Sequence, residues 1–393
     1  RKFIQLGSLA SAATMLPKFL KGFERYSLQP ENKVLVVIQL SGGNDGLNTV
    51  IPYRNDIYYS LRPVLGIAQN KVLPLNDEQG LHPALGSFKE LYDNGELALL
   101  NNVGYPNPDR SHFRSMDIWQ TASDSNEVIT TGWIGRYLDA QCAGCAKPSQ
   151  ALEMDDTLSL ALKGEKFTGI AVKDPRRLYG TSHDPYFKII QQNHPVDDDH
   201  LNVDYLYKVM AETMSSADYI YQQSKIYQSK ENYPNTDIGK DMRTIAELVV
   251  SNINTKVYYV SLGSFDTHVN QQPQQQRLFA QLSDAMKIFV QDLKKNNRFN
   301  DVMVMTFSEF GRRVGQNASG GTDHGTANCM FLISGRLKKK GILNAAPDLQ
   351  NLDQGDLKYQ VDFKDVYATM LHQWLNTDDA KILGHKHQYL DFI

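Results

Sequence analysis

Six short apolar runs, nearly continuous rather than alternating, constrain the fold of this chain most strongly. The runs are Val34–Leu40, Leu97–Leu100, Gly169–Val172, Val257–Leu262, Val302–Phe307 and Met330–Ile333. Strands with this pattern are buried on both faces, as in a parallel or mixed sheet that helices cover on each side. Segments with helical spacing lie between them: Pro83–Asn94, Ser111–Thr121, Leu201–Ser229, Asp237–Asn252, Pro273–Lys295 and Phe363–Leu375. The alternation predicts an α/β sandwich of three layers around a largely parallel sheet.

The length and net charge of the chain limit how many domains it forms and which partners it binds. The chain has 393 residues, 41% of them hydrophobic, which is enough for one large domain. We expect a single domain over residues 31–393, with an inserted cap or lid around 174–235, where Pro, His and Asp are frequent at its start. The net charge of -3 comes without a basic stripe, so we expect no nucleic-acid partner. The oligomeric state is not determined by these features.

The first 30 residues have the character of a targeting segment. Arg1 and Lys2 precede an Ala/Ser/Leu stretch that includes the small residues Ala10-Ser11-Ala12. The stretch resembles the second half of a twin-arginine export signal, and an amphipathic helix is the alternative. It is too short and too polar for a stable membrane anchor. We therefore expect an exported protein, periplasmic or extracellular.

The three cysteines of the chain do not identify a function. Cys142 and Cys145 form a CxxC spacing that fits a redox pair, half of a zinc knuckle or a local disulfide. Without a second CxxC the knuckle is disfavoured, and export favours the small disulfide. Cys329 precedes an apolar run, which predicts a buried thiol.

Polar residues follow the predicted strands, at the edge where open α/β sheets bind ligands. Asp45 follows the first run after Gly42 and Gly43, as a ligand or as part of a polar turn. Ser111 begins a predicted helix, where it can act as a nucleophile that the helix N-terminus supports or as a plain cap. Arg110 and His112 flank it and complete a candidate catalytic group.

Asp266 and His268 follow the fourth of these runs, Val257–Leu262. Side chains two residues apart in an extended segment point the same way, so both can enter one site. An oxygen and nitrogen pair of this kind suits zinc, manganese or iron better than calcium. A helix cap with a polar neighbour is the alternative.

The run Val302–Phe307 leads to Glu309 and Arg312, and a glycine-flanked pair, Asp323-His324, follows about ten residues later. Carboxylates and an imidazole are ligands for a divalent ion, and the guanidinium can bind an anion. Four strand ends with such groups predict a shared metal and anion site more strongly than any one motif does.

The order of these motifs resembles the alkaline-phosphatase-like superfamily, and more closely the exported "domain of unknown function 1501" family. The motifs are Gly-Gly-Asn-Asp45-Gly, Ser111-His-Phe, Phe-Asp266-Thr-His268, Ser-Glu309-Phe-Gly-Arg and Gly-Thr-Asp-His324-Gly. The superfamily resemblance implies a Ser nucleophile that attacks a phosphorus or sulfur ester, with two metals about 4 Å apart.

By position, the resemblance assigns a role to each candidate. Ser111 is the nucleophile, and Arg312 or Arg110 binds the non-bridging oxygens. One metal lies on Asp45 and Glu309, and the other on Asp266, His268 and His324. The chain departs from the pattern at Glu309-Phe310, where the superfamily usually has Asp-His. If Asp323-His324 is that pair displaced, Glu309 contacts the ligands and not the metal. The departures favour one metal, or a degenerate site, over two metals.

The sequence therefore predicts an exported hydrolase of phosphate or sulfate esters that depends on Zn, Mn or Ca. The ester is a small molecule or is linked to a glycan. The stretch Ser111-His-Phe-Arg114 lacks the pattern that sulfatases mature to formylglycine, which favours phosphate. Two alternatives are a non-catalytic binding module that retains the fold and a structural ion, and a phosphomutase.

Overall fold

The structure is a computed structural model that describes residues 32–141, 149–185, 189 and 201–393. The predicted export segment, the Cys142–Cys145 pair and part of the predicted lid lie outside the described residues. Among the described residues, none of the helices has the length and apolar character that crossing a membrane requires.

A mixed sheet of nine strands forms the centre of the domain. Its order is β11-β5-β10-β9-β1-β8-β6-β7, with β12 paired to β5. The bounds are β1 Val34–Leu40, β5 Leu97–Gly104, β6 Ala151–Glu153, β7 Ile170–Ala171, β8 Val257–Leu262, β9 Val302–Phe307, β10 Asn328–Ile333, β11 Gly341–Ile342 and β12 Val361–Asp362. Strand β1 pairs in parallel with β8 and β9, whereas β10 runs antiparallel to β9 and β5.

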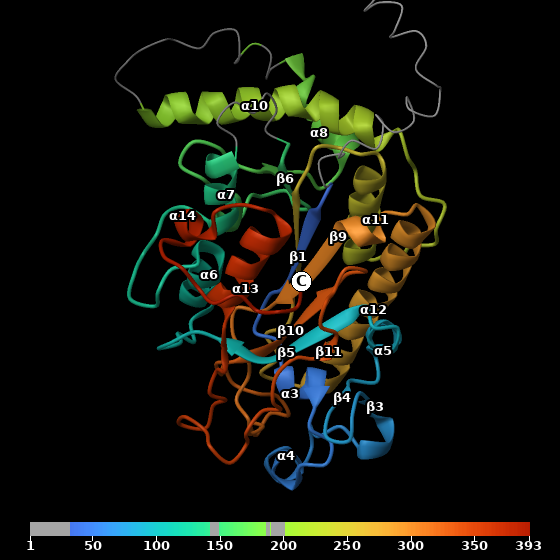
Figure 1. The fold of residues 1–393 in the computed structure, drawn as a ribbon, viewed down its shortest axis with the longest axis vertical. Helices are drawn as coiled ribbons and strands as arrows, with labels where there is room; N and C mark the ends of the chain where they lie inside the picture. Colours follow the sequence, from blue (N-terminus) through green and yellow to red (C-terminus); the bar gives the residue numbers. More distant parts are fainter. Residues whose placement is uncertain (1–31, 142–148, 186–188, 190–200) are drawn as a thin grey trace, which may run out of the picture. The chain divides into compact units, whose positions relative to one another are not determined.

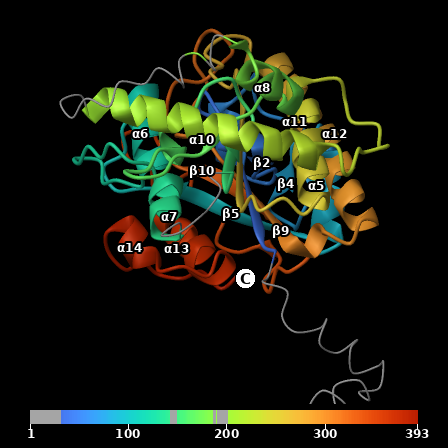
Figure 2. The ribbon, with the colours of Figure 1, turned by 90° about the horizontal axis from the view of Figure 1, so that it is seen from above.

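Helices cover both faces of this sheet, which confirms the predicted α/β architecture (Figure 1, Figure 2). One face carries α5 Gly86–Asp93, α11 Asp237–Val250 and α12 Gln271–Lys295, and the other carries α6 His112–Thr121, α7 Trp133–Gln141, α13 Phe363–Thr369 and α14 Asp379–Leu383. Alternate residues of β1 enter the two cores: Val36 and Ile38 pack toward α12, and Leu35 and Val37 toward α13. This division of one run between two cores explains why all of its residues but Gln39 are apolar.

A smaller unit beside the main sheet holds the loop after β1. It consists of α3 Gly46–Thr49, β2 Val50–Ile51, α4 Asp56–Leu61, β3 Leu73–Pro74 and β4 Gly80–Leu81. The strands pair in the order β2-β4-β3, and apolar side chains such as Ile51 and Tyr58 form its core. The unit matters for the site because α4 ends immediately before Arg62.

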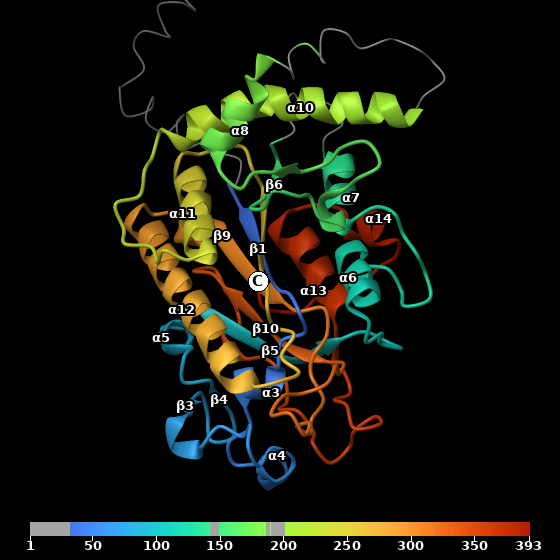
Figure 3. The same cartoon turned by 180° about the vertical axis from the view of Figure 1, so that it is seen from behind.

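The segment predicted as a lid contains α8 Pro175–Ser182 and α10 Leu201–Ser224. The Tyr219 hydroxyl of α10 accepts a hydrogen bond of 3.3 Å from the Asn254 N–H, which lies just before β8. Figures 1 and 3 likewise show α10 across the end of the sheet where β1 begins. The candidate site lies beyond the opposite strand ends, so α10 is not placed over it.

Candidate metal centre

The candidate site lies where β1, β8 and β9 end, in loops that approach one another closely. Gly42 follows β1 with a φ angle of 118°, a conformation that glycine adopts without strain. A Cβ atom on Gly42 would lie 2.4 Å from the backbone nitrogen of Asp266, which follows β8. The Gly42 N–H also donates to Oε1 of Glu309, which follows β9, at 2.8 Å. The missing side chain of Gly42 therefore lets the three strand ends meet.

His112, the first residue of α6, is oriented by Glu309. Its Nδ1 lies 2.9 Å from Oε1 of Glu309, and the carboxylate of Glu309 is fully buried. Oε1 of Glu309 also accepts the Gly42 N–H, so as an acceptor toward His112 it places a proton on Nδ1 and leaves Nε2 as a ligand atom. The hydrogen bond to Glu309 also raises the pKa of His112, against the effect of burial. Nε2 of His112 is buried and has no hydrogen-bond partner among the described residues.

His268 and His324 are oriented in the same way by other acceptors. Nδ1 of His268 lies 3.2 Å from Oδ1 of Asp323, and Nδ1 of His324 lies 2.8 Å from the carbonyl oxygen of Arg110. Hydrogen bonds from Asn317 and His268 lower the pKa of Asp323, which therefore stays an acceptor. Burial lowers the pKa of His324 and favours its neutral form, the one that binds metals.

The three Nε2 atoms converge on the carboxylate of Asp266. Those of His268 and His324 lie 3.1 and 3.3 Å from Oδ1, and that of His112 lies 3.6 Å from Oδ2. Ligand atoms of His112, Asp266 and His324 all lie within 4.8 Å of one another. The Nε2 atoms of His268 and His324 are 2.9 Å apart. Two unprotonated nitrogens at this distance repel each other unless a cation lies beside them, so the arrangement fits a metal ion.

Arg312 orients Asp266 from behind. Its guanidinium is completely buried and donates to Oδ1 of Asp266 at 2.8 Å. Its remaining contacts are backbone carbonyls, those of Gly42, Gly43, Phe265 and Thr322. Burial would raise the pKa of Asp266, but the hydrogen bond from the Arg312 guanidinium and the charge of that group lower it overall. Arg312 therefore keeps Asp266 ionised, and its buried guanidinium is not exposed to a substrate.

Phe310 packs between the imidazoles. Its ring centroid lies 4.8 Å from that of His112 and 4.6 Å from that of His324, and its side chain is buried. The phenyl ring thus restricts how both imidazoles rotate. Phe310 directly follows Glu309 in the chain, and the imidazole that contacts Glu309 comes from His112.

Asp45 lies apart from this group in a buried ion pair. Arg62 contacts both of its oxygens, at 2.6 and 3.0 Å, and both side chains are at most 1% exposed. Gln271 donates to the same carboxylate. Other donors of Arg62 bind Oδ1 of Asn48 and the carbonyl oxygens of Val314 and Arg313. A guanidinium therefore occupies the position where the sequence places a metal on Asp45.

Ser111 and Arg110 lie at the edge of the group. Ser111 is the N-cap residue of α6, but its hydroxyl makes no capping hydrogen bond, and the residue is exposed. The guanidinium of Arg110 is 41% exposed and pairs with the buried carboxylate of Asp356. Arg313 contacts the same carboxylate at 3.4 Å. Both candidates are accessible, and their roles stay predictions.

The structure brings most of the predicted residues together but changes how they are grouped. The group contains His112, Asp266, His268, Glu309, Arg312, Asp323 and His324. Glu309 and Asp323 each contact the Nδ1 atom of an imidazole, which for Glu309 is the alternative in which it lies behind the ligands. Sequence reasoning missed Arg62 and Gln271, which engage Asp45, because neither belongs to a motif that signals a buried partner.

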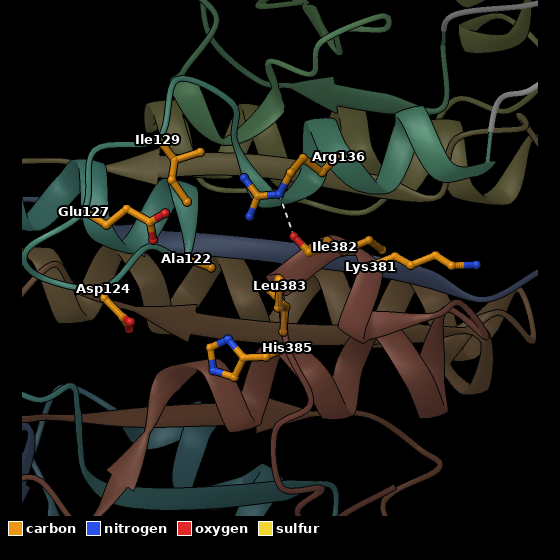
Figure 4. A pocket seen from close by; sticks show the side chains of 10 residues that line it. Ala122, Asp124, Glu127, Ile129, Arg136, Lys381, Ile382, Leu383 and His385 are labelled. Carbon is orange, nitrogen blue, oxygen red and sulfur yellow. Dashed lines mark hydrogen bonds between the residues drawn. The ribbon is translucent and has the colours of Figure 1, made fainter.

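Away from the strand ends, a cavity of about 370 Å³ lies between the segment around α7 and the end of α14 (Figure 4). Burial lowers the pKa of Arg136 in this cavity to about 10. Its guanidinium donates to the carbonyl oxygens of Ile382, Thr131 and Thr121, each at 2.6 Å. Because backbone carbonyls occupy these donors, the cavity is a weaker candidate for anion binding than the strand ends.

The fold and the site together define a domain of the α/β class with a candidate metal centre beyond its parallel strands. The sequence profile "Protein of unknown function (DUF1501)" matches residues 82–390. The chain therefore belongs to the DUF1501 family, as the motifs predict. No curated protein matches the chain.

Several solved structures are similar to the chain at low identity. A sulfatase from Pseudoalteromonas sp., PsFucS1, has 11% identity and a TM-score of 0.40, over 95% of this chain and 73% of that one. A protein in the alkaline phosphatase superfamily from Vibrio parahaemolyticus has 11% identity and a TM-score of 0.39, over 91% and 70%. The periplasmic domain of EcEptC from Escherichia coli, in complex with Zn, has 10% identity and a TM-score of 0.36, over 78% and 74%.

Proposed function

We propose that this protein is a metal-dependent hydrolase of phosphate or sulfate esters, and that it acts after export from the cytoplasm. One observation carries the proposal: three imidazole Nε2 atoms and the Asp266 carboxylate converge, while each Nδ1 has an acceptor. This is the donor set and the supporting shell of a metal site that binds zinc or manganese in preference to calcium. Export is inferred from the N-terminal sequence alone.

We further propose that the site holds one divalent ion. His112, His268, His324 and Asp266 are the ligands, whereas Asp45 is neutralised by Arg62 and is not available to a second ion. When bound, the ion polarises the ester and stabilises the charge that develops during hydrolysis. Glu309 and Asp323 fix the tautomers of two ligands, and Arg312 fixes the carboxylate.

The attacking group is either the Ser111 hydroxyl or a water molecule. Ser111 is exposed, precedes the ligand His112 directly and makes no capping bond, so its hydroxyl is free to act. The exposed Arg110 guanidinium can donate to non-bridging oxygens of the ester. Removal of the hydroxyl in Ser111→Ala separates the two routes: turnover is abolished if Ser111 attacks and largely retained if water does.

The proposal is tested with the full chain, expressed with zinc, manganese or calcium and assayed for bound metal and for turnover of phosphate monoesters, diesters and sulfate esters. We expect one metal per chain, and loss of turnover by more than about 100-fold in His268→Ala, because outer-shell partners alone contribute about 10–100-fold. His372→Ala is the matched control, because His372 is half-exposed and stacks on Tyr389.

The outcomes separate the alternatives. Bound metal without turnover of any ester indicates a binding module with a structural ion. Transfer of phosphate to a sugar acceptor rather than to water indicates a phosphomutase. Absence of both metal and turnover under all three supplements overturns the proposed function.

A further inference from the structure

An open cavity of about 660 Å³ lies directly beside the candidate metal centre. Asp266 lines it from one side, and the first turns of α12 line it from the other, with Gln274 and Arg277. The volume falls within the range of about 300–1,000 Å³ that small-molecule sites occupy. A substrate whose ester lies at Asp266 therefore has room in this cavity for the group that the ester joins.

Arg277 brings an uncompensated positive charge to this cavity. Among the residues that the structure describes, no carboxylate lies within ion-pair distance of its guanidinium, which instead donates to Oε1 of Gln274 at 2.7 Å. Gln274 in turn donates to the carbonyl oxygen of Ser264 at 3.3 Å. By contrast, Arg312 and Arg110, also near the site, each pair with a carboxylate. Arg277 is thus oriented by an amide while its charge stays available.

The rest of the lining combines polar and apolar side chains. Asn270 is exposed, and its side chain caps no backbone group of α12, so its amide is available to a ligand. Ser264 adds a hydroxyl, and Val269, which is 66% exposed, and Pro273 are apolar. Amides, hydroxyls and one guanidinium favour a ligand with several hydroxyl groups and a negative charge over an apolar ligand.

We propose that this cavity binds the alcohol part of the substrate, a hydroxyl-rich group with an anionic substituent of its own, which Arg277 recognises. The placement of the ester beside Asp266 rests on the function proposed above. Asp266 does not repel such a group, because Arg312 compensates its charge and it faces the imidazoles. A polar substrate with two anionic groups, one at the ester and one at Arg277, follows from this arrangement.

Two matched probes test the inference: glucose 1-phosphate and glucuronic acid 1-phosphate, which differ by one carboxylate on the sugar. Equilibrium binding to the zinc-loaded full chain is measured by calorimetry, and turnover is measured separately. We expect the uronate to bind about tenfold more tightly, because a charge-assisted hydrogen bond is worth about that factor. Arg277→Ala should reduce this ratio to about one, and Arg277→Lys should retain part of it.

Lys287→Ala is the control, because it removes one positive charge from the same helix outside the cavity, where Lys287 pairs with Glu90. It should leave the ratio unchanged. Equal binding of the two probes to the wild type, or a ratio that survives in Arg277→Ala, overturns the inference. A ratio that depends on Arg277 without turnover of either probe supports the cavity and counts against the hydrolase, so the two proposals fail separately.

Discussion

Two carboxylates follow neighbouring parallel strands, yet the fold treats them in opposite ways. Asp45, after β1, is sealed from solvent and bound on both oxygens by Arg62. Asp266, after β8, is 48% exposed and faces three imidazoles. A buried guanidinium neutralises Asp45, whereas the imidazoles beside Asp266 belong to the site where we propose that an ion binds. The comparison indicates that position at a strand end does not by itself create a metal ligand.

The largest expected effect is a loss of stability when Asp45, the buried carboxylate, loses its partner. Arg62→Met leaves Asp45 buried and unpaired, so we expect the free energy of unfolding to fall by about 3–5 kcal/mol in metal-free protein. Urea unfolding measures this loss. Asp266→Asn is the comparison: it keeps Oδ1 as an acceptor but leaves the buried Arg312 guanidinium without a charged partner, so it should lower metal-free stability by less than Arg62→Met does. Equal losses in the two variants would remove the distinction between the two carboxylates.

A third carboxylate, Glu153 on β6, extends the comparison because it is buried without a cation. Among the described residues no cation lies within ion-pair distance of it, and burial raises its pKa from 4.5 to about 7. The folded state then holds its proton more tightly than the unfolded state does. Stability is therefore fully present below about pH 4.5 and falls as the pH rises through 7, by at most about 3 kcal/mol.

Glu153→Gln removes this titration. The variant should be more stable than the wild type at pH 8, and the difference should shrink toward pH 4.5. Thermal unfolding across that range measures the difference between the two proteins. A difference that does not vary with pH would show that Glu153 is compensated in the folded protein as Asp45 is.

Metal removal tests the proposed role of Asp266, the exposed carboxylate of the comparison. At zinc concentrations 100-fold above the dissociation constant, we expect the wild type to gain about 2.7 kcal/mol over its chelator-treated form. Asp266→Asn should lose most of this gain, which differential scanning calorimetry detects. If zinc stabilises both proteins equally, the ion binds elsewhere.

The smallest expected effects are on zinc affinity, when the carboxylates that orient the imidazoles, Glu309 and Asp323, are replaced. Glu309→Gln should weaken zinc binding by about tenfold, because the amide holds the His112 tautomer less firmly than the buried carboxylate does. Asp323→Asn should have a smaller effect, because Asp323 is 58% exposed and water can replace it. Competition with a chromogenic chelator ranks the two variants, and the reverse ranking would contradict the roles given to the two acceptors.

The periodicity of the chain determined the sheet and its helical layers. The bounds of β1, β8 and β9 match the apolar runs, because these strands are buried on both faces except at Ser261 of β8. The short strand β6 was not predicted, since three residues carry no periodic signal. The antiparallel direction of β10 was likewise not determined, because an apolar run has no direction.

The sequence also determined which residue types reach the strand ends, and it grouped Asp266, His268 and His324 as one set. Only the tertiary structure decided their partners. Contacts such as His112–Glu309, 197 residues apart, and Arg62 with Asp45 depend on how loops meet in space. A strand that is buried on both faces needs apolar residues along its whole length, so it can be recognised in the sequence. A single side-chain contact between distant loops leaves no repeating pattern and cannot be recognised in this way.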